Sequence, residues 1–315
     1  MPPLRRMTFD LELDQVRPIV AGLDAALRPT AVSRLHGGST EVYRIDLAGA
    51  EPIVLKLYPD EPVWSPGKEV LVAGWLAAWG ELPAPRWLRV DESREALPWR
   101  YALTTWLPGE TVRSLKDEPD VLGLYREMGA WLRRLHRLPM EGYGYVLDQG
   151  VVSPRATNGD YVAAAFESAF REFVERSGEA ALASRLERAV QPRLPLASHS
   201  AGSFFAHDDF QPGNLLAARK DGTLALTGLL DFGNARAADP LFDLAKALFC
   251  CTHEDPRSPG PLLEGYGEID HPDVEGVLWL YTLYHRLVMW IFLTRIGVGP
   301  GGGPADLLRD LTSMA

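Results

Sequence analysis

Apolar and polar positions divide the chain into a β-rich first part and a mainly helical remainder. Two helices are expected in the first part, over residues 11–27 and 66–80, the second opened by Pro66 and ended by Gly80. Short apolar runs with the length and composition of strands lie around them, at 31–35, 41–47, 52–58, 85–90 and 99–106. This spacing favours an antiparallel sheet accompanied by one main helix.

Beyond a connector at residues 107–109 the pattern becomes helical, with one β-rich island at 204–231. Helices are expected over 121–137, 160–176, 179–190, 240–251 and 271–296. The chain is therefore predicted to adopt an α+β fold, with a small N-terminal β-sheet lobe and a larger helical C-terminal lobe. We place the division between residues 1–106 and 107–315, with a hinge at the end of the first part.

Length, charge and cysteine content narrow the class of protein. The 315 residues suit one large domain or two small lobes, and the net charge of −10 disfavours a nucleic-acid partner. Cys250 and Cys251 are adjacent, which fits neither a disulfide framework nor a metal site but fits a reducing cytoplasm. The most apolar stretch, 277–296, is interrupted by Arg286 and Arg295, so we expect a buried core helix. A cytoplasmic protein without a membrane or obligate protein partner is predicted.

The strongest chemical signal is an ordered set of three oxygen-bearing side chains, Asp209, Asn214 and Asp231. Phosphoryl transfer needs a carboxylate that orients an acceptor hydroxyl and takes its proton, and hard oxygen ligands that hold Mg²⁺ against phosphates. A hairpin over 215–230, turning at 220–223, would return Asp231 to the side of Asn214. The order and spacing indicate a site for a magnesium-bound nucleotide.

This set resembles the aminoglycoside phosphotransferase and choline kinase superfamily, relatives of the protein kinases. The resemblance implies a protein-kinase-like two-lobed fold and the transfer of a phosphoryl group from ATP or GTP to a small-molecule hydroxyl. It implies that Asp209 is the catalytic base, that His207 braces the catalytic loop, and that Asn214 and Asp231 bind Mg²⁺.

Further segments extend the resemblance from about residue 30 to about residue 290. Segments 128–136 and 239–245 are similar to family helices, and the resemblance implies that Asp243 holds the catalytic loop. Asp208 departs from the family, which more often has glycine there. An extra carboxylate beside the base could alter the choice of acceptor, but we expect the side chain to point to solvent. Asp231 is followed by Phe-Gly, as in protein kinases, which leaves the metal role unchanged.

The N-terminal part supplies candidate phosphate contacts. A loop between two strands can turn backbone N–H groups and hydroxyls toward phosphate oxygens, although by itself it is an ordinary hairpin turn; its residues are Gly37, Gly38, Ser39 and Thr40. Lys56 lies inside an apolar strand, where a buried ammonium needs an anion. The family resemblance places it on the phosphates and pairs it with Glu69. A solvated ion pair between Glu69 and the adjacent Lys68 is the alternative.

The nucleobase is expected to lie against the hinge, formed by Thr105, Trp106 and Leu107. Their backbone groups would contact the purine, and these contacts do not distinguish ATP from GTP. Trp106 either forms a wall of the pocket or belongs to the core.

The acceptor is less constrained by the sequence. Acidic residues outnumber basic ones over 254–275, which would suit a cationic aminoglycoside and an antibiotic resistance activity, or would equally be a solvated helical surface. The alternative is a metabolic kinase for a sugar, an amino alcohol or a choline-like compound. A protein kinase is disfavoured because no Gly-x-Gly-x-x-Gly loop or Ala-Pro-Glu segment is present. A non-catalytic nucleotide-binding module is disfavoured because no expected base or metal ligand is missing.

Overall fold

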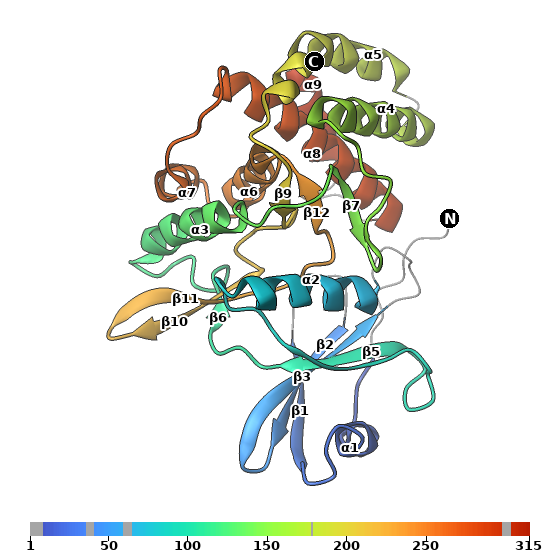
Figure 1. The fold of residues 1–315 in the computed structure, drawn as a ribbon, viewed down its shortest axis with the longest axis vertical. Coiled ribbons are helices and arrows are strands. Elements are labelled where there is room, and N and C mark those ends of the chain that lie inside the picture. Colours follow the sequence, from blue (N-terminus) through green and yellow to red (C-terminus); the bar gives the residue numbers. More distant parts are fainter. Residues whose placement is uncertain (1–8, 36–40, 59–64, 178, 298–303) are drawn as a thin grey trace.

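The computed structural model describes residues 9–35, 41–58, 65–177, 179–297 and 304–315. Its N-terminal part is built on a five-stranded sheet in which every neighbouring pair is antiparallel (Figure 1). In spatial order the strands are β1 (Pro29–Leu35), β2 (Glu41–Leu47), β3 (Ala50–Tyr58), β5 (Arg100–Thr105) and β4 (Trp87–Asp91). Burial alternates strictly along β2, so one face of the sheet is covered.

Two helices accompany this sheet. α1 (Leu13–Ala21) packs beside β1, and α2 (Pro66–Trp79) lies between the sheet and the C-terminal part (Figure 1). The first helix is shorter than expected, because Asp24 accepts a hydrogen bond from the Ala26 N–H and holds a turn there. The second follows its sequence signals: Ser65 caps it, and Gly80 ends it in a left-handed conformation with φ of 74°.

The C-terminal part is mainly helical and contains each of the five helices expected there. They are α3 (Val121–Leu135), α4 (Asn158–Ser177), α5 (Ala180–Val190), α6 (Pro240–Glu254) and α8 (Val274–Ile296). Three further helical segments in the described residues were not predicted: the 3₁₀ helix η1 (Gln191–His199), α7 (Pro259–Tyr266) and α9 (Pro304–Met314). The expected α+β arrangement, a small antiparallel sheet followed by a larger helical region, is confirmed. The division at residue 106 stays a prediction.

The β-rich island contributes to two small sheets, and the loop with Asp209 and Asn214 lies between their strands β9 and β10. One sheet has the order β11-β10-β6, from Thr223–Leu229, Leu215–Lys220 and Glu110–Thr111. The other has the order β8-β7-β12-β9, from Gly150–Val151, Gly144–Leu147, Arg236–Ala238 and Phe204–Ala206. The predicted hairpin is β10 and β11, joined at Asp221 and Gly222, which both have positive φ as a tight primed turn requires.

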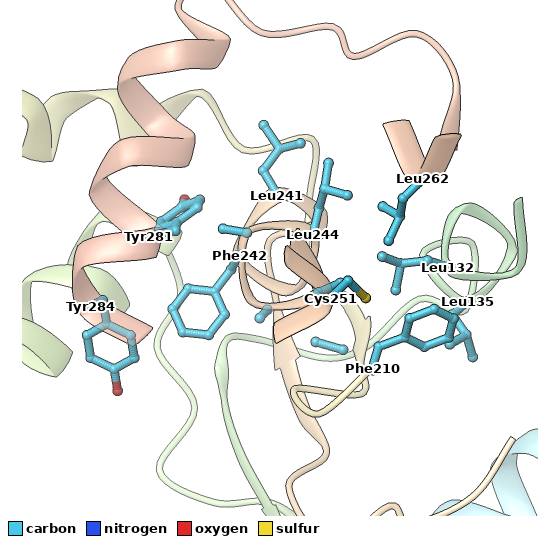
Figure 2. Packing of buried hydrophobic residues seen from close by; sticks show 14 of the residues in the cluster. Leu132, Leu135, Phe210, Leu241, Phe242, Leu244, Cys251, Leu262, Tyr281 and Tyr284 are labelled. Carbon is cyan, nitrogen blue, oxygen red and sulfur yellow. The ribbon is translucent and has the colours of Figure 1, made fainter. Parts of the chain in front are cut away.

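Two clusters of buried apolar residues hold the fold together. The smaller lies between the N-terminal sheet and α1, and includes Ile19 and Leu55. The larger fills the C-terminal part and takes in Val72 and Leu76 of α2. Figure 2 shows its centre, where apolar side chains of α6 lie between Tyr281 and Tyr284 of α8 on one side and leucines of α3 and α7 on the other. Burial on this scale fixes α6, which carries several residues described below.

α8 is the one helix in the described ranges that is long and apolar enough to cross a membrane by length and composition. It packs against α4, α6 and α9, and Leu280, Tyr281 and Leu283 are fully buried. This packing is that of a core helix, as expected from the arginines that interrupt its apolar stretch.

Candidate active site

The loop between β9 and β10 places Asp209 and Asn214 side by side. The Asn214 side-chain Nδ2 donates hydrogen bonds to the backbone oxygen and to the Oδ2 of Asp209, each over 2.9 Å. Gln211 Nε2 donates to the other carboxylate oxygen over 3.0 Å. Because the amide nitrogen of Asn214 is held by these bonds, its carbonyl oxygen is left for a cation.

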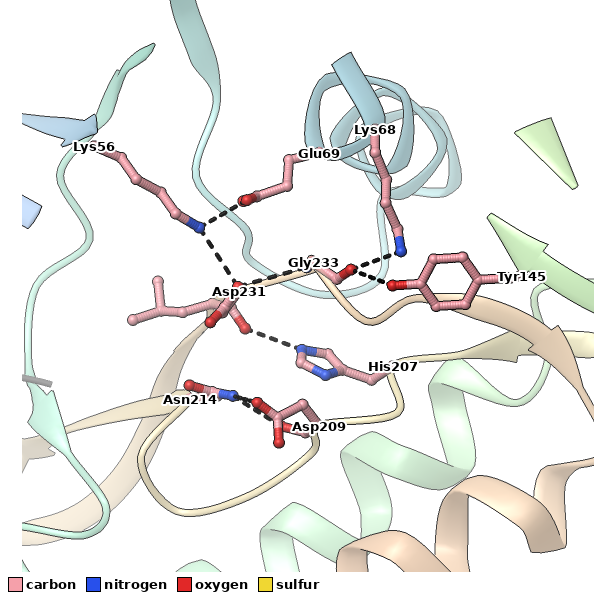
Figure 3. A network of polar contacts seen from close by, with 10 residues as sticks. Lys56, Lys68, Glu69, Tyr145, His207, Asp209, Asn214, Asp231 and Gly233 are labelled. Carbon is pink, nitrogen blue, oxygen red and sulfur yellow. Dashed lines mark hydrogen bonds and ion pairs between the residues drawn. The ribbon is translucent and has the colours of Figure 1, made fainter. Parts of the chain in front are cut away.

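Asp231 joins this pair from the end of β11. The Leu230 N–H donates to the Asn214 backbone oxygen over 2.9 Å, which brings the strand end beside the loop. Asp231 has φ of 62°, in the left-handed region that is uncommon for residues other than glycine. Figure 3 shows the three side chains in one region, as the sequence led us to expect.

Lys56 connects Asp231 to α2. Its Nζ lies 2.7 Å from the Oε1 of Glu69 and 3.4 Å from the Oδ1 of Asp231 (Figure 3). Burial alone would lower the pKa of Lys56, but the carboxylates of Asp231 and Glu69 outweigh it and raise that pKa. Lys56 in turn lowers the pKa of Asp231. Both groups are therefore charged at neutral pH, and Asp231, whose side chain is 44% exposed, offers an ionised carboxylate.

Lys68 does not form the solvated pair with Glu69 that was the alternative. It is fully buried, and its Nζ donates to the Gly233 backbone oxygen over 2.6 Å while lying 3.7 Å above the centre of the Tyr145 ring. The Tyr145 hydroxyl donates to the same oxygen over 3.0 Å (Figure 3). Burial first, and then the nearby Arg236, lower the pKa of Lys68 to about 7. Two donors thus fix the backbone just after Asp231.

The loop that carries Asp209 is held by α6 on one side and by Leu230, the residue after β11, on the other. The fully buried carboxylate of Asp243 accepts hydrogen bonds from the backbone N–H groups of His207, over 2.7 Å, and Asp208, over 2.8 Å. The Nε2 of His136 lies 3.2 Å from the same carboxylate. The Nε2 of His207 donates to the Leu230 oxygen over 2.9 Å. Asp243 therefore holds the loop, as expected.

Replacing Asp243 by asparagine is expected to lower the free energy of unfolding by about 3 kcal/mol, since a buried acceptor of several hydrogen bonds is replaced by a group that also donates. Burial raises the pKa of Asp243, but hydrogen bonds from His136 and the loop outweigh it and hold the pKa below its ordinary value. The stabilisation is therefore present above the ordinary pKa of roughly 4 and is lost as pH falls through the folded-state value.

Urea unfolding checks this at neutral pH and in acid. The difference between wild type and Asp243→Asn should be large at pH 7 and should shrink on acidification. The exposed Asp117, changed to asparagine, is the matched control and should unfold as the wild type does. An Asp243→Asn variant as stable as the wild type at pH 7 would remove Asp243 from this role.

The expectation that the Asp208 side chain points to solvent is wrong, because this side chain is buried. It is 4% exposed and forms an ion pair with Arg236, with the Nδ1 of His285 3.8 Å away. Its φ of 53° lies in the left-handed region, the conformation that glycine adopts without strain. The ion pair offsets the cost of burying the carboxylate in this conformation, and it depends on a residue that lies 28 positions later in the sequence.

The other predicted nucleotide contacts are the phosphate loop and the hinge, and only the hinge lies within the described residues. The proposed phosphate loop lies outside the described residues: Gly37, Gly38, Ser39 and Thr40. At the hinge, the Thr105 N–H donates to the Arg86 oxygen, and its hydroxyl accepts from the Arg86 N–H, each over 2.9 Å. Thr105 therefore has its N–H and its hydroxyl engaged within the sheet. Trp106 and Leu107 are half-buried, and the Arg44 guanidinium lies 4.7 Å over the Trp106 ring.

Several residues at the site were missed. Gln211, which orients Asp209, stands within the motif itself, so its position was a usable signal. Arg113 donates to the Gln211 Oε1 over 2.8 Å and pairs with Glu254, but it lies 98 positions before Gln211 in the sequence. Nothing local to Arg113 or Tyr145 in the sequence marks either as a neighbour of the site.

The side chains present fit a magnesium ion held partly by phosphates. Among the residues with described positions, no group of three or more His, Cys, Asp and Glu side chains could hold a metal ion alone. The carbonyl oxygen of Asn214 and the carboxylate of Asp231 are hard donors, and Mg²⁺ typically takes one or two such ligands together with water and substrate phosphates.

Comparisons with known proteins agree with this architecture. A family model for the phosphotransferase enzyme family matches residues 31–278. The crystal structure of aminoglycoside phosphotransferase APH(4)-Ia is similar over 96% of this chain and 97% of that chain, with a TM-score of 0.70 and 18% identity. A thermostable mutant of APH(4)-Ia in a ternary complex with ADP and hygromycin B covers 95% and 96%, with a TM-score of 0.67 and 17% identity. The GDP and kanamycin complex of APH(2")-IIia covers 96% and 98%, with a TM-score of 0.65 and 15% identity. At these identities the structural likeness shows the fold.

Proposed function

Because the chain belongs to the phosphotransferase enzyme family, we propose that it moves the γ-phosphoryl group of ATP or GTP, with Mg²⁺, onto a hydroxyl group of a small molecule. The observation that carries the proposal is the convergence of Asp209, Asn214 and Asp231, with Lys56 bonded to Asp231. A carboxylate, a neutral oxygen donor, an ionised carboxylate and an ammonium form the set that phosphoryl transfer requires.

Each side chain has a role that its contacts support. Asp209 would orient the acceptor hydroxyl and take its proton as the oxygen–phosphorus bond forms and the bond from the γ-phosphorus to the nucleoside diphosphate breaks. Asn214 and Asp231 would hold Mg²⁺, which would neutralise charge on the phosphate oxygens. Lys56 would contact the phosphates, and Glu69 would hold its ammonium in place. His207 would keep the loop against β11.

The nucleotide would lie between these groups and the hinge. The N–H of Thr105 is bonded within the sheet, so the backbone of Trp106 and Leu107 is the better candidate for contacts with the purine. Such contacts accept adenine or guanine. The undescribed loop with Gly37, Gly38, Ser39 and Thr40 is proposed to cover the phosphates. We also propose a cytoplasmic location without a nucleic-acid, membrane or obligate protein partner, supported by the charge of −10 and by two free cysteines.

Two acceptor classes follow from the sequence. An aminoglycoside is supported by the likeness to enzymes solved with hygromycin B and kanamycin. The acidic stretch gives it less support, because several of its side chains are engaged: Glu254 with Arg113, Asp255 with Arg257, Glu264 with Arg126, and Asp273 as the cap of α8. The second class, a metabolic hydroxyl compound, does not depend on a free acidic surface. Nucleotide consumption measured with ATP and GTP across aminoglycosides and metabolites separates the two, and no turnover with any acceptor would count against both.

Replacing Lys56 by methionine is expected to lower kcat by about a hundredfold, because the ammonium positions the phosphates for transfer. Methionine keeps much of the side-chain length inside the apolar strand, so folding should be retained. The exposed Lys116 changed to methionine serves as the control for the loss of one charge. Steady-state kinetics with ATP and GTP give the answer, and unchanged kcat and KM in Lys56→Met would move this residue out of the site.

A further inference from the structure

A pocket of about 370 Å³ lies beside the segments that carry Asp209 and Asp231, and neither of these side chains lines it. It is bounded by the β7–β8 hairpin, the start of α4, β12 and α8. Aromatic and basic side chains line much of it: Tyr143, Tyr145, Tyr161, Tyr284, Arg155 and Arg236. Its volume is at the lower end of the range of small-molecule sites, roughly 300–1,000 Å³.

Two side chains in the pocket wall contact the segments that carry the proposed base and metal ligand. Arg236 in its wall forms the ion pair with Asp208, the residue before Asp209. Tyr145, also in the wall, donates its hydroxyl to the Gly233 oxygen, two residues after Asp231. A molecule in this pocket would therefore touch two side chains, Arg236 and Tyr145, that hold residues close in sequence to Asp209 and Asp231.

The chemistry of the wall is aromatic and cationic. Four tyrosines line it, and the rings of Tyr143 and Tyr161 are stacked with their centres 6.4 Å apart. Arg236 is buried among aromatic rings, donates to the Tyr161 hydroxyl over 2.8 Å, and is neutralised by Asp208. No carboxylate belongs to the lining, within the part of the chain that the structure describes.

Arg155 gives the pocket its uncompensated charge. Its backbone is fixed by paired hydrogen bonds to Tyr143, over 2.8 and 2.9 Å, so the side chain begins from a defined place on the rim. The side chain is exposed, and none of its neighbours among the described residues forms an ion pair with it. A guanidinium presents a planar fork of donors that matches a carboxylate.

We propose that this pocket binds the acceptor, and that the acceptor is a ring compound with hydroxyl groups and an acidic group, such as an acidic sugar. The tyrosine rings would cover the face of the ring, and Arg155 would pair with the acidic group. A polycation would meet an arginine at the rim and no carboxylate in the wall. This assignment rests on the proposed phosphotransferase function and specifies its acceptor.

Binding of two matched probes tests the assignment. p-Nitrophenyl β-D-glucuronide and p-nitrophenyl β-D-glucoside share the ring and the hydroxyls and differ in the carboxylate, so calorimetry on the full chain isolates the acidic group. We expect the wild type to bind the glucuronide about tenfold more tightly than the glucoside, as one charge-assisted hydrogen-bonded pair provides. Kanamycin should not displace the glucuronide.

Two variants and a control locate the binding. Arg155→Ala should abolish the preference for the glucuronide, whereas Arg185→Ala, which removes an exposed arginine on α5, should keep it. Ala164 also lines the pocket, and Ala164→Trp should fill part of it and weaken both probes at least tenfold. The thermal midpoint of each variant shows that it is folded, and the exposed position of Arg155 keeps the test open if Ala164→Trp does not fold.

The outcomes separate this inference from the proposed function. Four results would each overturn the acceptor assignment. Two concern the preference: equal affinity for the two probes, or a preference that survives in Arg155→Ala. The others are displacement by kanamycin and a bound glucuronide that gains no phosphate from ATP or GTP. A wild type that consumes neither nucleotide with Mg²⁺ would overturn the proposed function instead, whatever the probes do.

Discussion

Asp209→Asn is expected to lower kcat by about a thousandfold, within the range that a general base contributes. The substitution keeps the size of the side chain but removes the carboxylate that would accept the hydroxyl proton. Because the Oδ2 already accepts from Asn214 and the Oδ1 from Gln211, the carboxylate is held in one orientation, so its loss should fall mainly on kcat.

An asparagine at position 209 would also disturb these two hydrogen bonds, so the control must separate geometry from chemistry. Gln211→Leu removes the hydrogen bond to the Oδ1 and keeps the carboxylate. We expect it to lower kcat by about tenfold, in line with one lost orienting hydrogen bond. Kinetics with the best acceptor from the screen give both values, and an Asp209→Asn enzyme as active as Gln211→Leu would leave Asp209 without the role of base.

Asp231→Asn is expected to remove Mg²⁺-dependent turnover, with a loss of at least a thousandfold. An ionised carboxylate is exchanged for an amide of the same shape, which is a much weaker ligand for a hard cation. Lys56 keeps its 2.7 Å ion pair with Glu69, so the strand and α2 should stay joined. Turnover measured over a range of Mg²⁺ concentrations checks this, and normal activity would refute the metal role.

The parts of the site that were predictable are those set by local spacing. Asp209 and Asn214 lie in one short loop, and a hairpin of ordinary length with an Asp-Gly turn returns Asp231 to them. Lys56 and Glu69 could be paired on the family resemblance because a strand and the following helix bring them together. In each case the residues are joined by a short connection, which allows few arrangements of the two side chains.

The parts that could not be predicted depend on segments far apart in the sequence. Asp208 was expected in solvent, and its burial became clear only with Arg236 and His285 beside it. Lys68 is buried because Gly233 and Tyr145, from distant strands, meet it. The tyrosine-lined pocket likewise draws on α4, α8, β7 and β12, and no single stretch carries its pattern.

The α-helices that the sequence pattern does not predict are short or terminal. α7 has 8 residues, which gives a periodic pattern little length in which to appear, and α9 follows a glycine-rich stretch near the end of the chain. α1 was overextended because apolar positions continue past Ala21 into a turn held by Asp24. The periodicity of apolar positions therefore does not define these helices or the end of α1, which depend on tertiary packing and side-chain hydrogen bonds.

Calorimetric binding of ATP and GTP, with and without Mg²⁺, to wild type and Asp231→Asn tests the shared metal and nucleotide site most directly. The wild type should bind the preferred triphosphate at least tenfold more tightly when Mg²⁺ is present, and Asp231→Asn should show no such gain. An equal gain in both proteins would place the metal away from Asp231 and contradict the account.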